Sequence, residues 1–298
     1  MKTITNRDVT ELHISPEQCV EWVRDAFILK SECQLPAKMA VHPSGNDFFM
    51  TMPCLLPASY GRFGVKVVSR IVGRQPALKS DMMLFDSTSG ELLSLVDCDW
   101  ITAMRTGAVA ALAIKTLRSS KARDYAFIGL GSTARATLRC LLATCGCEQL
   151  NIRLFRYKDQ AERIVVEFGD VPNARFTIVD TADDLVRGAD VVVSCITDAS
   201  GLIVEDESLF KSGVLVVPVH TRGFQNCDTT FDKVYADDTD HVKGFKYFSE
   251  FKEFHQLEEV LKGVTPGRES DDERILSYNI GLGLHDVLYA SRIYDMLQ

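Results

Sequence analysis

Three observations predict an α/β protein in which a doubly wound parallel sheet is joined to a second, α+β part with an antiparallel sheet. Between residues 125 and 235, short apolar runs alternate with helical patterns. The runs at 191–193 and 214–217 are continuously apolar, as expected of strands that are covered on both faces. Residues 38–97 instead hold short apolar runs broken by Gly, Pro and Ser, which is typical of antiparallel strands joined by turns.

The first part is expected to begin with a helix. Ser15 is its predicted N-cap and Pro16 its first helical residue, and apolar residues then repeat at helical spacing to about residue 29. A second helix is expected at 100–117, where the many small side chains predict close packing. Between these helices, the antiparallel strands are expected at residues 48–52, 64–68, 82–85 and 92–96.

The second part is the alternating series of strands and helices. The strands are expected at residues 125–128, 150–155, 176–179, 190–195, 214–219 and 233–235, and the helices at 134–143, 160–168 and 182–186. A loop at 263–272 then leads to a last helix at 283–296. The polar stretch at 119–123 predicts the boundary between a discontinuous domain, residues 1–119 plus 275–298, and a domain of residues 120–274.

The composition limits the classes of partner. The chain has 298 residues and a formal net charge of −8, without any basic block, so nucleic-acid binding is not expected. No apolar run is long enough to span a membrane, and the first residues lack a secretory pattern. Nine scattered cysteines predict free thiols and a cytoplasmic location. The close pair Cys145 and Cys147 has no further ligands nearby, so no metal site is expected.

A glycine pair marks a candidate phosphate site. The apolar run at 125–128 leads into Gly129-Leu130-Gly131, and a helical pattern follows. A strand that turns on glycines into a helix leaves backbone N–H groups at the positive end of the helix dipole, where the pyrophosphate of a dinucleotide binds. A turn of this kind is typical of Rossmann-type sheets. The alternative is a tight turn without a ligand.

The acidic run 237–241, Asp-Asp-Thr-Asp-His, has two interpretations. Its carboxylates could bind a divalent cation, but a solvated loop is the preferred reading of such a cluster.

Three cations are candidates for holding a substrate carboxylate, which hydride transfer to or from a nicotinamide would require. Lys38 follows a proline, and Lys66 lies in a strand, where solvent exposure is the alternative. Arg105 interrupts a helix of small apolar residues, so it should have an anionic partner, either protein or ligand.

Taken together, several motifs resemble the ornithine cyclodeaminase/μ-crystallin family. They are Gly64-x-Lys66, Asp86-x-x-Ser89-Gly90, Arg105-Thr106-Gly107-Ala108, Gly129-x-Gly131, Gly267-Arg268, and Gly281-Leu-Gly-Leu-His-Asp286 before the last helix. The resemblance covers nearly the whole chain. It implies a homodimer that uses NAD(H) or NADP(H) and acts on small α-amino or α-imino acids, with the first domain forming the dimer and the substrate pocket.

The resemblance also implies roles for individual residues. Lys66, helped by Lys38, would hold the substrate carboxylate, and Gly281 would contact the substrate. The cofactor would be bound by Arg105, Thr106, Gly129, Gly131, Ser132, Thr133, Arg156, Thr197 and Ile280.

Two positions depart from the cyclodeaminase pattern. Lys38 stands where the family often has arginine, which keeps the charge but loses the bidentate fork. His220 stands where cyclodeaminases have an aspartate general base. A histidine can pass a proton near neutral pH, but it offers no negative charge for a second ammonium. His220 is therefore a candidate proton donor, and its alternative role is to cap the cofactor crevice.

The expected function is hydride transfer at the α-carbon of a small imino or amino acid, by a ketimine reductase or an amino-acid dehydrogenase. The alternatives are an ammonia-releasing lyase and a binding protein without turnover. Arg156 and Lys158 follow the second strand of the nucleotide domain and favour NADP(H), with NAD(H) possible.

Overall fold

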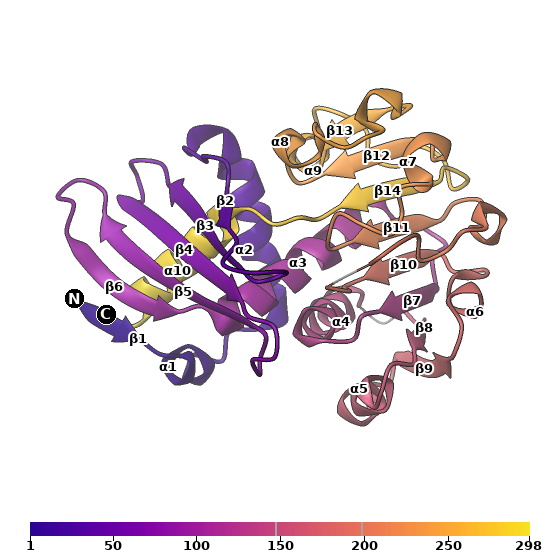
Figure 1. Ribbon diagram of the computed structural model, residues 1–298, viewed down its shortest axis with the longest axis horizontal. Coiled ribbons are helices and arrows are strands. Elements are labelled where there is room, and N and C mark those ends of the chain that lie inside the picture. The colour runs from indigo at the N-terminus through magenta and orange to yellow at the C-terminus, as the bar shows by residue number, and fades with distance from the viewer. Residues whose placement is uncertain (147, 198) are drawn as a thin grey trace. The chain divides into compact units, whose positions relative to one another are not determined.

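The computed structural model describes residues 1–146, 148–197 and 199–298, so Cys147 of the close cysteine pair lies outside the described residues. The chain forms two compact units (Figure 1). Unit 1 comprises Met1–Arg105 and Leu282–Gln298, and unit 2 comprises Thr106–Gly281. The division falls inside helix α3 (Asp99–Leu117). The sequence-based domain boundaries at 119 and 275 stay a prediction.

Unit 1 is built on a six-stranded sheet with the order β1-β6-β5-β4-β3-β2. Strand β1 is parallel to β6, and the other neighbours are antiparallel. The strands are β1 (Lys2–Ile4), β2 (Met39–Val41), β3 (Phe48–Leu55), β4 (Arg62–Arg70), β5 (Leu78–Asp86) and β6 (Leu92–Asp97). The four antiparallel strands expected from the sequence are confirmed as β3 to β6, whereas β1 and β2 were not predicted.

One face of this sheet is covered by helix α10 (Gly283–Met296), which contacts β3, β4, β5 and helix α2 (Pro16–Leu29). Ser15 caps α2, as predicted, by accepting the N–H of Gln18. A side chain at Gly64 of β4 would come within 2.7 Å of Val287, so the missing side chain lets α10 approach the strand. Helix α1 (Asn6–Glu11) and the 3₁₀ turn η1 (Lys30–Glu32) complete unit 1.

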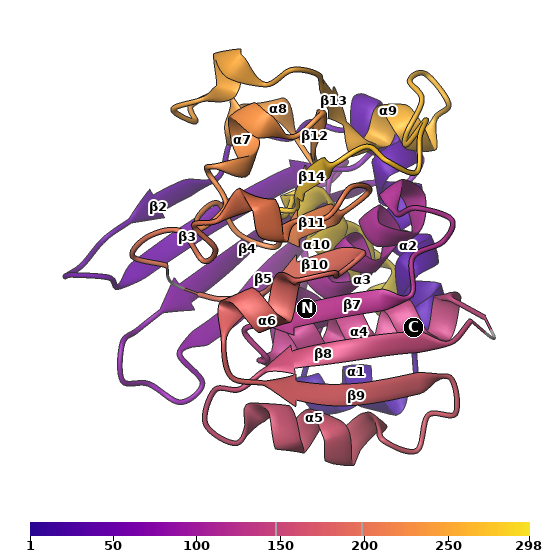
Figure 2. The same cartoon turned by 90° about the vertical axis from the view of Figure 1, so that its right-hand side faces the viewer.

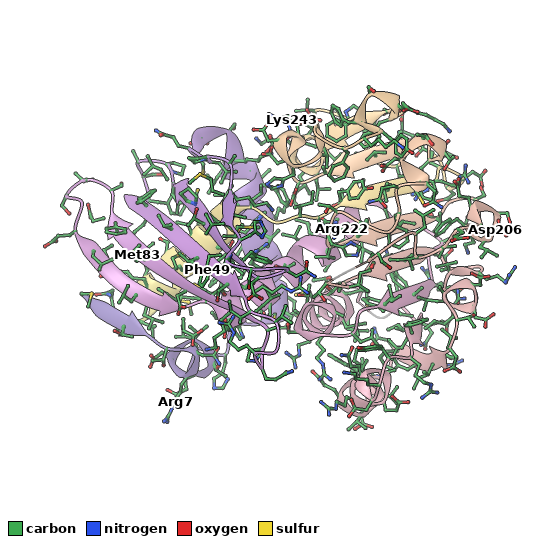
Figure 3. The ribbon with its side chains drawn as sticks, in the orientation of Figure 1. Arg7, Phe49, Met83, Asp206, Arg222 and Lys243 are labelled. Atoms are coloured by element: carbon green, nitrogen blue, oxygen red, sulfur yellow. The ribbon has the colours of Figure 1, made fainter. Side chains whose placement is uncertain are left out.

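The other face of the sheet carries apolar side chains that remain accessible. The register places Val65 opposite Met83, and Met83 opposite Leu95. Met83 and Leu95 are each 39% exposed, and Phe49 of β3 is 41% exposed (Figure 3). A groove of about 500 Å³ runs over this face, between β1, β4, β5 and β6.

Unit 2 is an eight-stranded sheet in which all neighbours are parallel (Figure 2). Its order is β13-β12-β14-β11-β10-β7-β8-β9. The strands are β7 (Asp124–Ile128), β8 (Leu150–Phe155), β9 (Ala174–Val179), β10 (Val191–Ser194), β11 (Leu215–Pro218), β12 (Lys233–Ala236), β13 (Phe254–Gln256) and β14 (Ile275–Tyr278). The predicted doubly wound parallel sheet is confirmed. Strands β13 and β14 were not predicted, and β14 lies between β11 and β12.

Of the helices that follow α3 in unit 2, the first three match the predicted alternation and the last three were not predicted. They are α4 (Ser132–Thr144), α5 (Gln160–Phe168), α6 (Ala182–Val186), α7 (Cys227–Thr230), α8 (Thr239–Val242) and α9 (Leu257–Leu261), with 3₁₀ turns η2 (Glu207–Leu209) and η3 (Phe248–Glu250). All residues of β10, β11, β12 and β14 are buried, which agrees with the continuous apolar runs at 191–193 and 214–217 in β10 and β11. At Gly107 of α3, a side chain would lie 2.5 Å from the backbone of α4, so the predicted close packing is helix on helix.

Within the described residues, no helix has both the length and the apolar character needed to cross a membrane.

Candidate functional site

The glycine turn after β7 has the geometry of a phosphate cradle. Gly129 has φ +78°, and a side chain there would lie 2.4 Å from the backbone of Ile196. Gly131 is the N-cap of α4, and a side chain there would meet nothing within 4 Å. Ser132 and Thr133 form the first turn of α4, so their backbone N–H groups lack intrahelical partners. An anionic group can approach these N–H groups closely.

A cavity of about 420 Å³ adjoins this turn, entirely within unit 2. It is lined by Ile128, Gly129, Gly131, Phe155, Tyr157, Gln160, Cys195, Ile196 and Thr197. These residues end or follow β7, β8 and β10, so the cavity lies at the carboxyl ends of adjacent parallel strands, at the edge where the strand order reverses direction. The predicted residues Gly129, Gly131 and Thr197 are therefore brought together.

The cations after β8 are already engaged with carboxylates. Arg156 donates to Asp180 at 2.7 Å and is also paired with Glu162. The hydrogen bond with Asp180, followed by the charge of Glu162, raises the pKa of the exposed Arg156 guanidinium. Lys158 has φ +53° and places its ammonium over the ring of Tyr157. Positive charge is thus present at this turn, but part of it is neutralised by acidic neighbours.

His220 lies two residues beyond β11 and is bonded through both ring nitrogens. The N–H of Arg222 donates to Nδ1 at 3.3 Å, and Nε2 lies 2.7 Å from Oγ of Ser194. The first contact needs a bare Nδ1, so the neutral ring carries its proton on Nε2 and donates it to Ser194. Burial lowers the pKa of His220 to about 4. The resting ring is therefore neutral near pH 7.

The acidic run 237–241 follows β12, and its first residue, Asp237, is buried rather than solvated as the sequence had suggested. Asp237 is fully buried, and its Oδ2 accepts the backbone N–H of Gly281. Its Oδ1 lies 3.0 Å from Nδ1 of His241. Ile280 and Gly281 follow β14, the strand next to β12 in the sheet. Over the part of the chain that the structure describes, no three His, Cys, Asp or Glu side chains are grouped to hold a metal ion.

In unit 1, three charged side chains from three elements form a buried cluster. Lys66 of β4 places Nζ 2.6 Å from Oδ1 of Asp286 on α10. Arg105 of α3 donates from Nε to the same oxygen at 2.8 Å. Lys66 and Asp286 are 0% exposed, and Arg105 is 5% exposed. The predicted anionic partner of Arg105 is therefore a protein carboxylate, and the predicted pocket cation Lys66 faces the interior.

The electrostatics of this cluster favour an added anion. Burial, followed by the charge of Arg105, lowers the pKa of Lys66 to about 8. Burial alone would raise the pKa of Asp286, but Arg105 and Lys66 together hold it below its usual value. Two cations thus share one carboxylate, and the charged cluster carries one surplus positive charge.

Several donors of the cluster remain for a ligand. Lys66 also donates to Oγ1 of Thr102 at 3.4 Å. Of the three N–H donors of the Lys66 ammonium, one is then available to a ligand. Among the described residues, the two terminal nitrogens of Arg105 have no bonded protein partner. A carboxylate is the anion whose two oxygens match such donors.

The remaining predicted residues have less defined surroundings. Lys38 directly precedes β2 and is half-buried. Thr106 follows Arg105 on α3 and is also half-buried.

Sequence reasoning did not assign Asp286, Ser194 or Asp237 to the site. Asp286 could have been found as the acid that interrupts the apolar run at 282–290, just as Arg105 interrupts its own helix. Asp237 gave no comparable signal, because it reads as one member of an acidic run.

The chain matches known proteins over its whole length. The model of the ornithine cyclodeaminase/mu-crystallin family matches residues 1–298. The chain is 30% identical over 275 residues to the nodulation efficiency protein NfeD of Rhizobium meliloti, covering 88% of this chain and 84% of that protein. It is 27% identical over 237 residues to the N-((2S)-2-amino-2-carboxyethyl)-L-glutamate dehydrogenase of Staphylococcus aureus, covering 73% and 68%.

Two solved structures share the fold. The Δ1-pyrroline-2-carboxylate reductase of Thermococcus litoralis, in complex with NADH and L-proline, has a TM-score of 0.85 at 23% identity, covering 99% of this chain and 97% of that one. An archaeal alanine dehydrogenase dimer with bound NAD has a TM-score of 0.84 at 22% identity, covering 99% and 95%. At these identities the likeness shows the fold, and the predicted fold class is confirmed.

Proposed function

Because this chain belongs to the ornithine cyclodeaminase/mu-crystallin family, we propose that it is an NAD(P)H-dependent oxidoreductase that acts on the α-carbon of a small imino or amino acid. Relatives named as a glutamate-derivative dehydrogenase and a Δ1-pyrroline-2-carboxylate reductase support this class of reaction. The observation that carries the proposal is the buried cluster of Lys66, Arg105 and Asp286, whose surplus positive charge suits a substrate carboxylate.

The residues of unit 2 fit a dinucleotide. The backbone N–H groups of Ser132 and Thr133 would hold the pyrophosphate, with the open space at Gly131 allowing its approach, and the cavity bounded by Phe155 and Thr197 would hold the adenosine side. When bound, the reduced cofactor supplies a hydride to the imine carbon, while the imine nitrogen takes a proton, which gives the amino acid and the oxidised cofactor.

The chain's own residues would bind and orient the substrate. Lys66 and Arg105 would hold the substrate carboxylate, with Lys38 in support, and Gly281 would contact the substrate. Asp286 would keep the two cations in place. For His220 we propose a role in proton transfer. Its ring is neutral and its Nε2 is bonded to Ser194, so it would pass a proton through the Ser194 hydroxyl. Water is the alternative donor of the proton to the imine nitrogen.

For the cofactor, we propose that NADP(H) is preferred and NAD(H) is accepted. Arg156 and Lys158 support the preference because a 2′-phosphate needs cations at this turn. Asp180 and Glu162 would moderate it, because they compete for Arg156.

The Arg156→Ala variant tests this preference. We expect the ratio of kcat/KM for NADPH to that for NADH to fall by about tenfold, because one charge-assisted hydrogen bond to the phosphate is lost. Arg163→Ala is the matched control, since Arg163 lies on α5 and pairs with Asp159 at the surface. An unchanged ratio in Arg156→Ala would contradict the proposed role.

We further propose a homodimer formed through the exposed apolar face of the unit 1 sheet, around Phe49, Met83 and Leu95. Light scattering is expected to give twice the chain mass of 33.2 kDa. Met83→Asp would place a charge in the centre of this face and shift the protein toward the monomer. A monomer in the wild type would rule out this face as a stable interface.

The test of the proposed function is NAD(P)H oxidation with a panel of imino acids. Δ1-pyrroline-2-carboxylate, Δ1-piperideine-2-carboxylate, and pyruvate with an added amine cover cyclic and acyclic ketimines. Steady NAD(P)H consumption with one of them is expected. Nucleotide binding without any consumption would instead indicate a binding protein.

A further inference from the structure

Asp237 links the carboxyl ends of two neighbouring strands of unit 2. It directly follows β12, and Ala236 of β12 is paired with Tyr278 of β14. Its backbone N–H donates to the carbonyl of Tyr278 at 3.2 Å, and its side chain accepts the N–H of Gly281. The backbone bond and the side-chain bond together tie the segment 279–281 to the end of β12.

The segment held in this way has an unusual backbone. Gly281 has φ +91°, a conformation that residues with a side chain rarely adopt, and it is buried. A buried N–H needs an acceptor, and here the carboxylate of Asp237 provides it. A charged acceptor bonds more strongly than a neutral one, so this contact defines where the Gly281 backbone lies.

The first residue of the segment, Asn279, has a buried oxygen that is not satisfied by the described part of the protein. Asn279 is 2% exposed, and its amide nitrogen donates to the carbonyl of Ser277 at 2.9 Å. The buried Oδ1 of Asn279 has no hydrogen-bond donor among the described residues. His241 contacts the second oxygen of Asp237, so the carboxylate itself is held from two sides.

We propose that Asp237 is a positioning residue for the reaction. It fixes the backbone at Ile280 and at Gly281, which the proposed function places against the substrate, and its own side chain does not touch the substrate. This inference rests on that proposed function. A displaced Gly281 would leave nucleotide affinity nearly unchanged but would misalign the reacting carbon, and a displacement of about 1 Å can cost about 100-fold in rate.

Three variants separate positioning from folding. Asp237→Ala removes the contacts of the carboxylate with Gly281 and His241. Asp237→Asn is the conservative rescue, because its amide oxygen can still accept from Gly281 while its nitrogen donates to His241. Asp240→Asn is the matched control on helix α8, where the carboxylate is exposed and pairs with Lys243 at 2.7 Å.

Three quantities are measured for each variant: the Kd for NADPH, the kcat per nucleotide-binding site, and the hydrogen exchange of the Gly281 amide. For Asp237→Ala we expect kcat to fall by about 30-fold to 100-fold, with Kd within about threefold and faster exchange at Gly281. Asp237→Asn should stay within about fivefold of the wild type. Asp240→Asn should match the wild type in Kd, kcat and hydrogen exchange.

A merely structural role would lower the fraction of protein that binds nucleotide while leaving kcat per binding site unchanged, and that result would overturn the proposal. Unchanged exchange at Gly281 in Asp237→Ala would overturn it as well. If the wild type itself reduces no imino acid, the proposed function fails, and the Gly281 exchange still decides whether Asp237 fixes this segment.

Discussion

The Lys66→Met variant is expected to lose about 100-fold to 1000-fold in kcat/KM for the imino acid while it still binds NADPH. The substitution keeps the apolar stem but removes the buried ammonium, and losing one partner of a buried charge pair costs about 2–5 kcal/mol. Lys79→Ala is the control, because Lys79 lies on neighbouring β5 with its side chain 50% exposed. Full activity in Lys66→Met would remove Lys66 from the site.

The same lysine predicts a pH dependence. Burial lowers the pKa of Lys66 to about 8, so its ammonium is lost as the pH rises through that value. Since only the charged form binds a carboxylate, kcat/KM should fall above about pH 8 rather than above the ordinary lysine pKa near 10.4. Lys66→Arg should move this descending limb to higher pH, because a guanidinium stays protonated. If the descending limb of the pH profile is the same in Lys66→Arg as in the wild type, it reports the titration of a group other than Lys66.

Asp286→Asn is expected to lower the free energy of unfolding by about 3–5 kcal/mol. The change leaves the cations of Lys66 and Arg105 buried without their shared carboxylate, and breaking a buried ion pair from one side is strongly destabilising. Urea denaturation of the wild type and the variant measures the difference.

Asp295→Asn is the matched control for that experiment. Asp295 lies on the same helix α10, but its side chain is 58% exposed in its pair with Arg62, so a loss of at most about 1 kcal/mol is expected. Equal losses in the two variants would show that the Asp286 carboxylate does not stabilise the buried cluster.

The fold could be predicted where local sequence signals are strong. The expected bounds of β8, α5, α6 and α10 agree with the structure, because apolar periodicity and turn residues mark their ends. Strand β14 was missed although β10, β11 and β12 are equally short, because Ser277 interrupts its apolar run and its partners β11 and β12 are distant in sequence. A short run of this kind carries no local signal for its place in the sheet.

The candidate site could be predicted residue by residue, but not as an arrangement. Strand alternation allows Lys66 to face either side, and the side is settled by α10, which comes more than 200 residues later. The need of Arg105 for an anion followed from its apolar surroundings, whereas the identity of that anion as Asp286 required the fold. Asp237 shows the same limit, because its burial depends on the neighbouring strand β14.

The reaction that we propose for this chain is hydride transfer to the α-carbon of an imino acid. The most direct measurement uses NADPH that carries deuterium at the transferable C4 position, with mass spectrometry of the amino acid formed from Δ1-pyrroline-2-carboxylate or another substrate of the panel. We expect one deuterium at the α-carbon of the product. An amino acid without the label, or no amino acid formed from any imino acid, would contradict it.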